Sequence, residues 1–151
     1  MAQVKYDTDG PISMGGTLEG HADYNPTVLD HYRNPRNVGD IPGSPAVAQV
    51  GDPAHGDVLR LALRIEKDRI VEARFRSFGC TAAIAAGSMV TVMVSGRQVG
   101  EALRLTNGDV ARELGGLPES KMHCSVLAEQ AIREAIRRWR AATPSAEDSC
   151  R

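Results

Sequence analysis

Two runs of alternating residues, joined by a short polar turn, constrain the fold of this chain most strongly. From residue 58 to residue 65, apolar side chains occupy every second position and arginines stand between them. Residues 70–78 repeat the pattern, and a period of two predicts strands with one buried face. The turn at residues 66–69 makes the pair an antiparallel hairpin, and residues 46–50 are expected to add a third strand at its edge. In the second run we expect the apolar face to be formed by Val71, Ala73 and Phe75.

Helices are predicted on both sides of the hairpin. Residues 81–95 are mostly alanine, valine, isoleucine and methionine, and a helix that is apolar almost all round is a buried one. Before the hairpin, Asn25 and Pro26 fit the N-cap and the first position of a short helix. Further short helices are expected over residues 99–103 and 107–114, with the first residue of the latter as its N-cap.

The last helix shows apolar residues at helical spacing between Val126 and Trp139. Two glutamates stand four positions before an arginine, the orientation in which an ion pair supports a helix. Strands followed by helices are typical of an α+β domain. We therefore predict a small antiparallel sheet of about three strands, helices packed on one of its faces, and a long C-terminal helix.

The length and composition of the chain fit one domain. The chain has 151 residues and a formal net charge of −1, so no general attraction to nucleic acid or to an anionic membrane is expected. We assign residues 24–142 to the domain, residues 1–23 to a flexible N-terminal tail and residues 143–151 to a disordered C-terminal tail. No run approaches the roughly 18 apolar residues of a membrane span. The start of the chain resembles neither a secretion signal nor a transit peptide, so a cytoplasmic protein is expected.

The three cysteines are Cys80, Cys124 and Cys150. An odd, widely spaced set in a chain without an export signal argues for reduced thiols and against a disulfide framework. Cys150 lies in the polar C-terminal tail and is interpreted as an incidental exposed thiol. The other two become candidates for metal binding or catalysis.

Metal-ligand side chains stand at the starts of three predicted elements. An imidazole and a carboxylate lie two positions apart just before the first strand of the hairpin, where alternate residues point to the same side. Each of two thiols lies at a helix start, where free N–H groups and the helix dipole stabilise a thiolate. Such a set suits zinc, iron or an iron–sulfur cluster, and suits magnesium or calcium poorly. The predicted metal ligands are His55, Asp57, Cys80 and Cys124.

Several of these residues lie in stretches that resemble one known family, the NifU-like (IscU) iron–sulfur cluster assembly scaffolds. The likeness covers about residues 24–140, and its motifs occur in the family's order. It is carried by the run Asp-His-Tyr-Arg-Asn-Pro-Arg-Asn-Val-Gly at 30–39, Gly-Asp at 56–57, Phe-Gly-Cys at 78–80, Ala-Ile-Ala at 83–85 and His-Cys-Ser-Val-Leu-Ala-Glu at 123–129.

The resemblance implies a SufE/NifU-like α+β fold and a carrier rather than a turnover enzyme. Such a scaffold accepts sulfur from a cysteine desulfurase, binds iron, forms a labile [2Fe–2S] cluster and transfers it to acceptor apo-proteins. The family's three cluster cysteines correspond to position 55, Cys80 and Cys124, and its aspartate corresponds to Asp57. By the same likeness His123 is an alternative ligand and Cys124 is the persulfide acceptor.

Two positions differ from the family's pattern. Position 55 is histidine where the family has cysteine; imidazole replaces thiolate in some clusters and raises their potential. The loop before the His-Cys pair usually reads Leu-Pro-Pro-Val-Lys in the family. Here residues 117–121 read Leu-Pro-Glu-Ser-Lys, which weakens the apolar contact expected for an Hsp70-type chaperone.

Three functions remain open at the level of the sequence. The first is a scaffold that assembles and transfers a [2Fe–2S] cluster. The second is a zinc-bound sulfur acceptor of the SufU-like type, although the chain lacks the insertion that these relatives usually carry before the His-Cys pair. The third is a degenerate module that has lost cluster assembly with the change at residue 55 and keeps a partner interface.

Overall fold

The structure is a computed structural model that describes residues 24–52 and 56–143. Apart from Thr143, the two predicted tails lie outside the described residues, and so does His55. The elements are α1 (Pro26–Arg33), β1 (Ala46–Asp52), β2 (Asp57–Glu66), β3 (Arg69–Phe78), α2 (Thr81–Val94), α3 (Val99–Ala102), α4 (Asn107–Glu113), a 3-10 turn (Glu119–Lys121) and α5 (Met122–Ala142).

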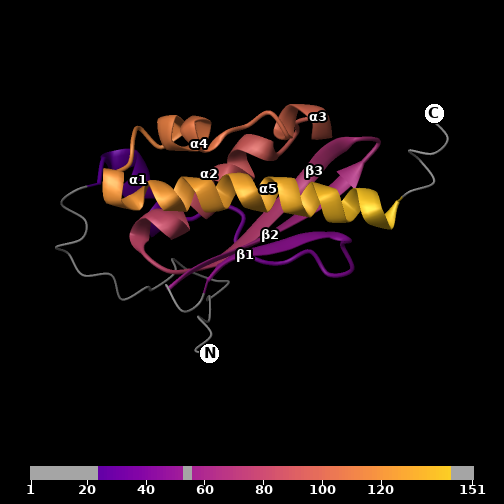
Figure 1. The fold of residues 1–151 in the computed structure, drawn as a ribbon, viewed down its shortest axis with the longest axis horizontal. Helices are drawn as coiled ribbons and strands as arrows, with labels where there is room; N and C mark the ends of the chain where they lie inside the picture. The colour runs from indigo at the N-terminus through magenta and orange to yellow at the C-terminus, as the bar shows by residue number, and fades with distance from the viewer. Residues whose placement is uncertain (1–23, 53–55, 144–151) are drawn as a thin grey trace.

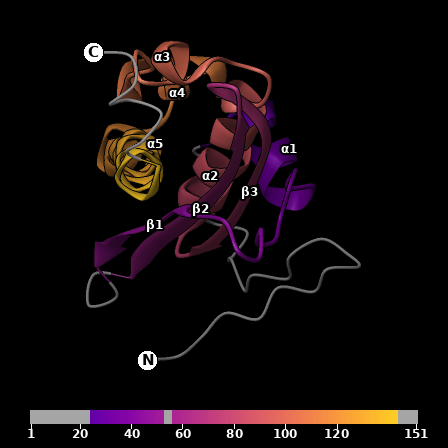
Figure 2. The same cartoon turned by 90° about the vertical axis from the view of Figure 1, so that its right-hand side faces the viewer.

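The three strands form one antiparallel sheet in the order β1-β2-β3. Helices α2 and α5 pack on the sheet, with α1 against α2 and α4 against α5, and Figure 2 shows α2 and α5 on the same side of the strands. The inner face of β2 carries three buried leucines. The predicted α+β architecture, its third edge strand and the long C-terminal helix are confirmed (Figure 1). Within the described ranges, no helix is long and apolar enough to cross a membrane.

The hairpin departs from the predicted alternation at one residue. Its turn is formed by Lys67 and Asp68, whose φ angles of 52° and 63° match the twist that two-residue hairpin turns favour. Just beyond the turn, the pairing register shifts by one residue, which leaves Val71 opposite no partner. Val71 is therefore 39% exposed, while Ile70 is fully buried. The prediction that Val71 faces the core was wrong because a β-bulge reverses the faces at this point.

Helix α2 lies unusually close to the sheet. Every residue of the helix except Val92 is buried, as its apolar composition predicted. A Cβ atom at Gly87 would come within 2.5 Å of the Phe75 ring and 3.0 Å of a Leu59 methyl group. The absence of a side chain at residue 87 is what allows the helix to approach β2 and β3.

The helix N-caps agree with the sequence in one case and differ in another. Asn25 caps α1 as predicted, since its side-chain oxygen accepts bonds from the first-turn backbone N–H groups. Helix α4 is capped by Thr106 and not by Asn107, because Thr106 and Asp109 form a reciprocal capping box. Asn107 instead donates its backbone and side-chain N–H groups to Glu129 of α5, at 2.6 and 3.0 Å. These two hydrogen bonds fix α4 against α5.

The family-like run at residues 30–39 is anchored to the rest of the fold. His31 is buried, and its Nδ1 lies 2.8 Å from the Ser88 hydroxyl of α2, which also accepts the backbone N–H of Arg36 at 2.9 Å. Further along, Phe75 of β3 exchanges two backbone hydrogen bonds of 2.9 Å with this run. The run therefore joins α2 to the outer edge of β3.

We predict that Gly87→Ala destabilises the protein although alanine is the better helix former. Alanine gains at most about 1 kcal/mol in helix propensity, whereas overpacking a core costs about 1–3 kcal/mol. Urea unfolding followed by far-UV circular dichroism measures the free energy of unfolding. The matched control is Gly100→Ala in α3, where an added Cβ would contact nothing within 4 Å. Equal stability of the two variants would contradict the close approach of α2.

Candidate metal centre

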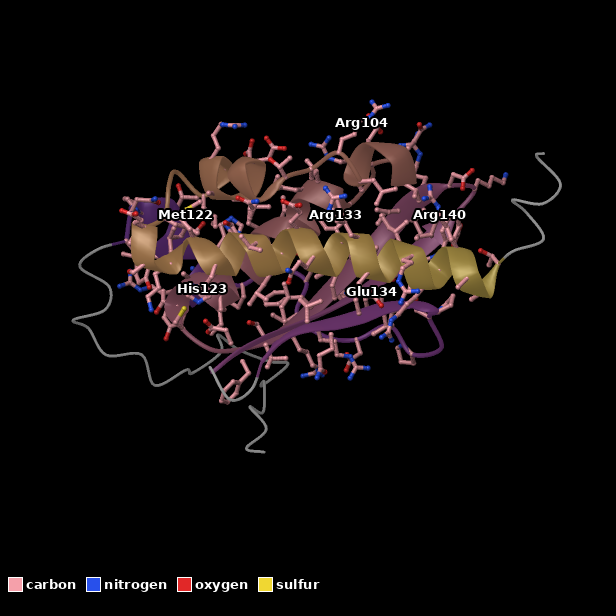
Figure 3. All side chains as sticks on the ribbon, in the orientation of Figure 1. Arg104, Met122, His123, Arg133, Glu134 and Arg140 are labelled. Carbon is pink, nitrogen blue, oxygen red and sulfur yellow. The ribbon has the colours of Figure 1, made fainter. Side chains whose placement is uncertain are left out.

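Four of the predicted site residues come together at one end of the molecule, and they arrive from three elements. Asp57 is the first residue of β2, Cys80 is the N-cap of α2, and His123 and Cys124 lie in the first turn of α5. Figure 3 shows His123 next to Met122, at the opposite end of α5 from Arg140. The sheet and the two helices thus bring together residues that are distant in sequence.

The Asp57 carboxylate connects the three elements. Its Oδ1 accepts the backbone N–H of Cys80 at 3.2 Å, and its Oδ2 accepts a hydrogen bond from His123 Nε2. Gly79 makes this approach possible, because a Cβ atom at residue 79 would overlap Asp57 Oδ1. The carboxylate is mostly buried, whereas half of the His123 side-chain surface is exposed.

The two thiols lie side by side. Cys80 Sγ and Cys124 Sγ are 3.6 Å apart, which is hydrogen-bond distance and far beyond the roughly 2.05 Å of a disulfide. Both cysteines are free. Cys124 is 1% exposed and Cys80 is half-buried, so Cys80 is the more accessible of the two.

The thiol pair has opposite pKa shifts. The hydrogen bond from Cys124 lowers the pKa of Cys80 to about 6, against the effect of burial and with help from the backbone N–H of Ala83. The same contact raises the pKa of Cys124, and burial and the neighbouring negative charges act in that direction too. The pair therefore loses its first proton readily and holds the second, which the two sulfurs share across their short contact.

The geometry gathers a three-residue donor group. The ligand atoms of Asp57, His123 and Cys124 all lie within 4.8 Å of one another, and His123 Nε2 is 3.5 Å from Cys124 Sγ. Cys80 joins this group through its contact with Cys124. Carboxylate, imidazole and thiolate together form a set that zinc and iron accept. A single ion can therefore be held where β2 meets the start of α5.

The described geometry agrees with the predicted ligand set in three residues and gives His123 a more central place than predicted. It brings Asp57, Cys80 and Cys124 together, and it places His123, expected as an alternative ligand, among the nearest donors.

His55 lies outside the described residues, as do His21 and Cys150. His31 bonds to Ser88 and belongs to the packing of α1 on α2.

Sequence reasoning missed Lys121 as a site residue. Its positive charge adds to the lowering of the Cys80 pKa and partly opposes the rise in the Cys124 pKa, as the smallest of the effects on each thiol. The sequence feature that could have identified Lys121 is its position two residues before His123, at the N-cap of α5. A cation at this point favours the anionic forms of sulfur that metal binding requires.

Comparisons with known proteins identify the family of this chain. The family described as NifU-like N terminal domain matches residues 23–146. The iron-sulfur cluster assembly scaffold protein IscU 1 of Archaeoglobus fulgidus is 48% identical over 113 residues, 75% of this chain and 74% of that protein. The nitrogen fixation protein NifU of Nostoc is 45% identical over 134 residues, 83% of this chain and 45% of that protein.

A solved structure shares the fold. The N-terminal NifU-like protein from Brucella abortus aligns with a TM-score of 0.62 and 19% identity, over 80% of this chain and 96% of that one. At this identity the likeness concerns the fold alone, while the family match covers all of the described residues. The chain belongs to the NifU-like N-terminal domain family.

Proposed function

We propose that this protein is an iron–sulfur cluster assembly scaffold. It accepts sulfur from a cysteine desulfurase, binds iron, forms a [2Fe–2S] cluster as its cargo and passes the cluster to acceptor apo-proteins. The observation that carries the proposal is the pair of thiols 3.6 Å apart, bordered by the Asp57 carboxylate and the His123 imidazole. Relatives named as cluster assembly scaffolds support it.

The sulfur-accepting step follows from the proton shared by the two thiols. Cys124 Sγ attacks the outer sulfur of a persulfide carried by the desulfurase, and its proton moves to the Cys80 thiolate. The sulfur–sulfur bond of the donor breaks, and the donor cysteine leaves as a thiolate. The products are a persulfide on Cys124 and a thiol on Cys80, with no net oxidation. Cys80 thus serves as the base for the proposed acceptor.

The cluster would be held by the same side chains. A [2Fe–2S] cluster needs four protein donors, and we assign Cys80, Cys124, Asp57 and His55, with His123 as an exchangeable donor. The carboxylate and the imidazoles bind iron less strongly than thiolates do. A cluster with only two thiolate ligands is therefore expected to be labile, as transfer to an acceptor requires.

A second candidate is a zinc-bound sulfur acceptor, and the three-residue donor group favours it. Asp57, His123 and Cys124 would hold the zinc ion, with Cys80 adjacent. Zinc supplies a positive charge that keeps a bound thiol deprotonated. In this case sulfur reaches the protein but no cluster forms on it.

We predict that the anaerobically purified protein assembles a cluster when given iron, cysteine and a cysteine desulfurase. The measurement is visible absorption from sulfide-to-iron charge transfer, together with bound iron and zinc. Cys80→Ser and Cys124→Ser should each lose most of this absorption, because a hydroxyl is a poor ligand for iron. The matched control is Cys150→Ser, which should assemble as wild type does.

The same measurement separates the candidate functions. Tight zinc and a persulfide on Cys124 without charge-transfer absorption would favour the zinc-bound acceptor. Neither metal nor persulfide would leave a degenerate module that binds partners only. Full assembly by the Cys80→Ser or Cys124→Ser variant would contradict the proposed site.

We predict that alkylation of Cys80 by iodoacetamide rises with pH through about 6, since its pKa is lowered to about 6. A lowered pKa means that the thiolate predominates at pH 7 and is lost as the pH falls below 6. Cys124→Ala removes the S–H donor and returns the pKa of Cys80 towards about 8.5, which lowers its thiolate fraction at pH 7 about thirty-fold. Alkylation at pH 7 slows by less, about three-fold, because the more basic thiolate is the better nucleophile. Cys124→Ser keeps a donor and is the control. Mass spectrometry assigns the modified residue, and an unchanged profile in the alanine variant would exclude the shared proton.

We predict that His55→Cys lengthens the lifetime of the assembled cluster. The substitution supplies a third thiolate ligand and restores the residue of the family's pattern. Decay of the charge-transfer absorption under a chelator measures the lifetime, with His21→Cys as the control for an added thiol. An unchanged or shorter lifetime would count against residue 55 as a ligand.

A further inference from the structure

One side chain joins the start of α1 to the connection between α4 and α5. The Asn25 oxygen accepts the backbone N–H groups of Thr27 and Val28 at 2.9 and 3.1 Å. Its amide nitrogen points the other way and donates to the backbone oxygen of Gly116 at 2.9 Å. Both polar atoms of the amide are therefore in use, and only one of them caps the helix.

The connection is shaped to receive this amide. Gly115 and Gly116 follow α4 with φ angles of 83° and 103°, and a Cβ atom at Gly115 would come within 3.0 Å of the Asn25 amide nitrogen. On either side of the contact, Tyr24 and Leu117 pack against the core. Asn25 thus lies directly on the two glycines, between two apolar anchors.

The contact matters because of where the connection leads. After Gly116 the chain passes through the 3-10 turn at Glu119–Lys121 and enters α5 at Met122, immediately before His123 and Cys124. The bond from Asn25 ties this connection to α1, an element other than the two helices that it joins. Figure 1 shows α1 at the same end of the molecule as the start of α5.

We propose that Asn25 is a positioning residue for the thiol site. By holding Gly116 in place it fixes the approach to α5, so that His123 and Cys124 face Asp57 and Cys80. The role in sulfur acceptance rests on the proposed function, whereas the positioning of Cys124 does not. Loss of the amide donor would loosen residues 115–124 while α1 stays capped.

The test is Asn25→Asp, which separates the two roles of the side chain. Aspartate caps helices as well as asparagine does, but it cannot donate to Gly116 and it places a negative charge against the backbone oxygen. The matched control is Asn34→Asp at the other end of α1. Asn34 donates to Asp30 of its own helix at 3.3 Å, and none of its described contacts is with the α4–α5 connection.

The first readout needs neither a desulfurase nor iron. Hydrogen exchange followed by mass spectrometry should show residues 115–124 about five-fold less protected in Asn25→Asp, the factor expected for one neutral hydrogen bond. Alkylation of Cys124 relative to Cys80 should rise by a similar factor, because local opening exposes the buried thiol selectively. Global unfolding would expose both thiols, so alkylation of Cys124 relative to Cys80 would not rise selectively.

The second readout is the rate of persulfide formation on Cys124 at saturating desulfurase, which should fall about five-fold in Asn25→Asp alone. Loosening exposes Cys124 to a small alkylating agent, but it also takes Cys124 away from Cys80, which accepts its proton in the proposed step. Unchanged protection of residues 115–124, or equal loosening by Asn34→Asp, would overturn the positioning role. Loosening without a slower rate would overturn the part that concerns sulfur acceptance. If wild type forms no persulfide, the proposed function fails, and the exchange result still decides the positioning role.

Discussion

The site depends on a single carboxylate that faces three chain segments at once. Asp57 accepts hydrogen bonds from the start of α2 and from the start of α5, and its own backbone begins β2. The bond from Cys80 satisfies a free N–H group at the start of α2, and the bond from the His123 ring ties the start of α5 to the same carboxylate. The thiols and the imidazole lie close together because these segments do.

Periodicity predicted the elements well because each depends on local pattern and on burial of one face. The hairpin, the buried helix and the capped α1 are of this kind. The bulge at Val71 was missed because strand register is a property of two segments and cannot be read from one. Thr106 was missed as a cap because Asn107 is an equally good capping residue in sequence and is occupied by Glu129 in the fold.

The candidate site was predictable in its residue types and not in its electrostatics. Two thiols at two helix starts predicted two thiolates. Their separation of 3.6 Å gives a different result, since two negative charges at that distance repel and one proton is retained between them. Likewise His123 was predicted only as an alternative ligand, whereas the fold places its Nε2 against Asp57 and near Cys124. Such coupling appears only when the folded chain sets the distances.

The anchoring of residues 30–39 has a consequence for how such chains are classified. The stretch that most clearly resembles the family joins α2 to β3 through His31, Arg36 and backbone bonds, and the described contacts of its histidine are within the core. These contacts hold the fold together and involve none of the candidate metal ligands. A chain can therefore keep this stretch intact while the residues at its ligand positions change. Grouping relatives by the residues at their ligand positions would therefore separate proteins with different metal chemistry. Grouping them by the stretch at residues 30–39 would put those proteins together.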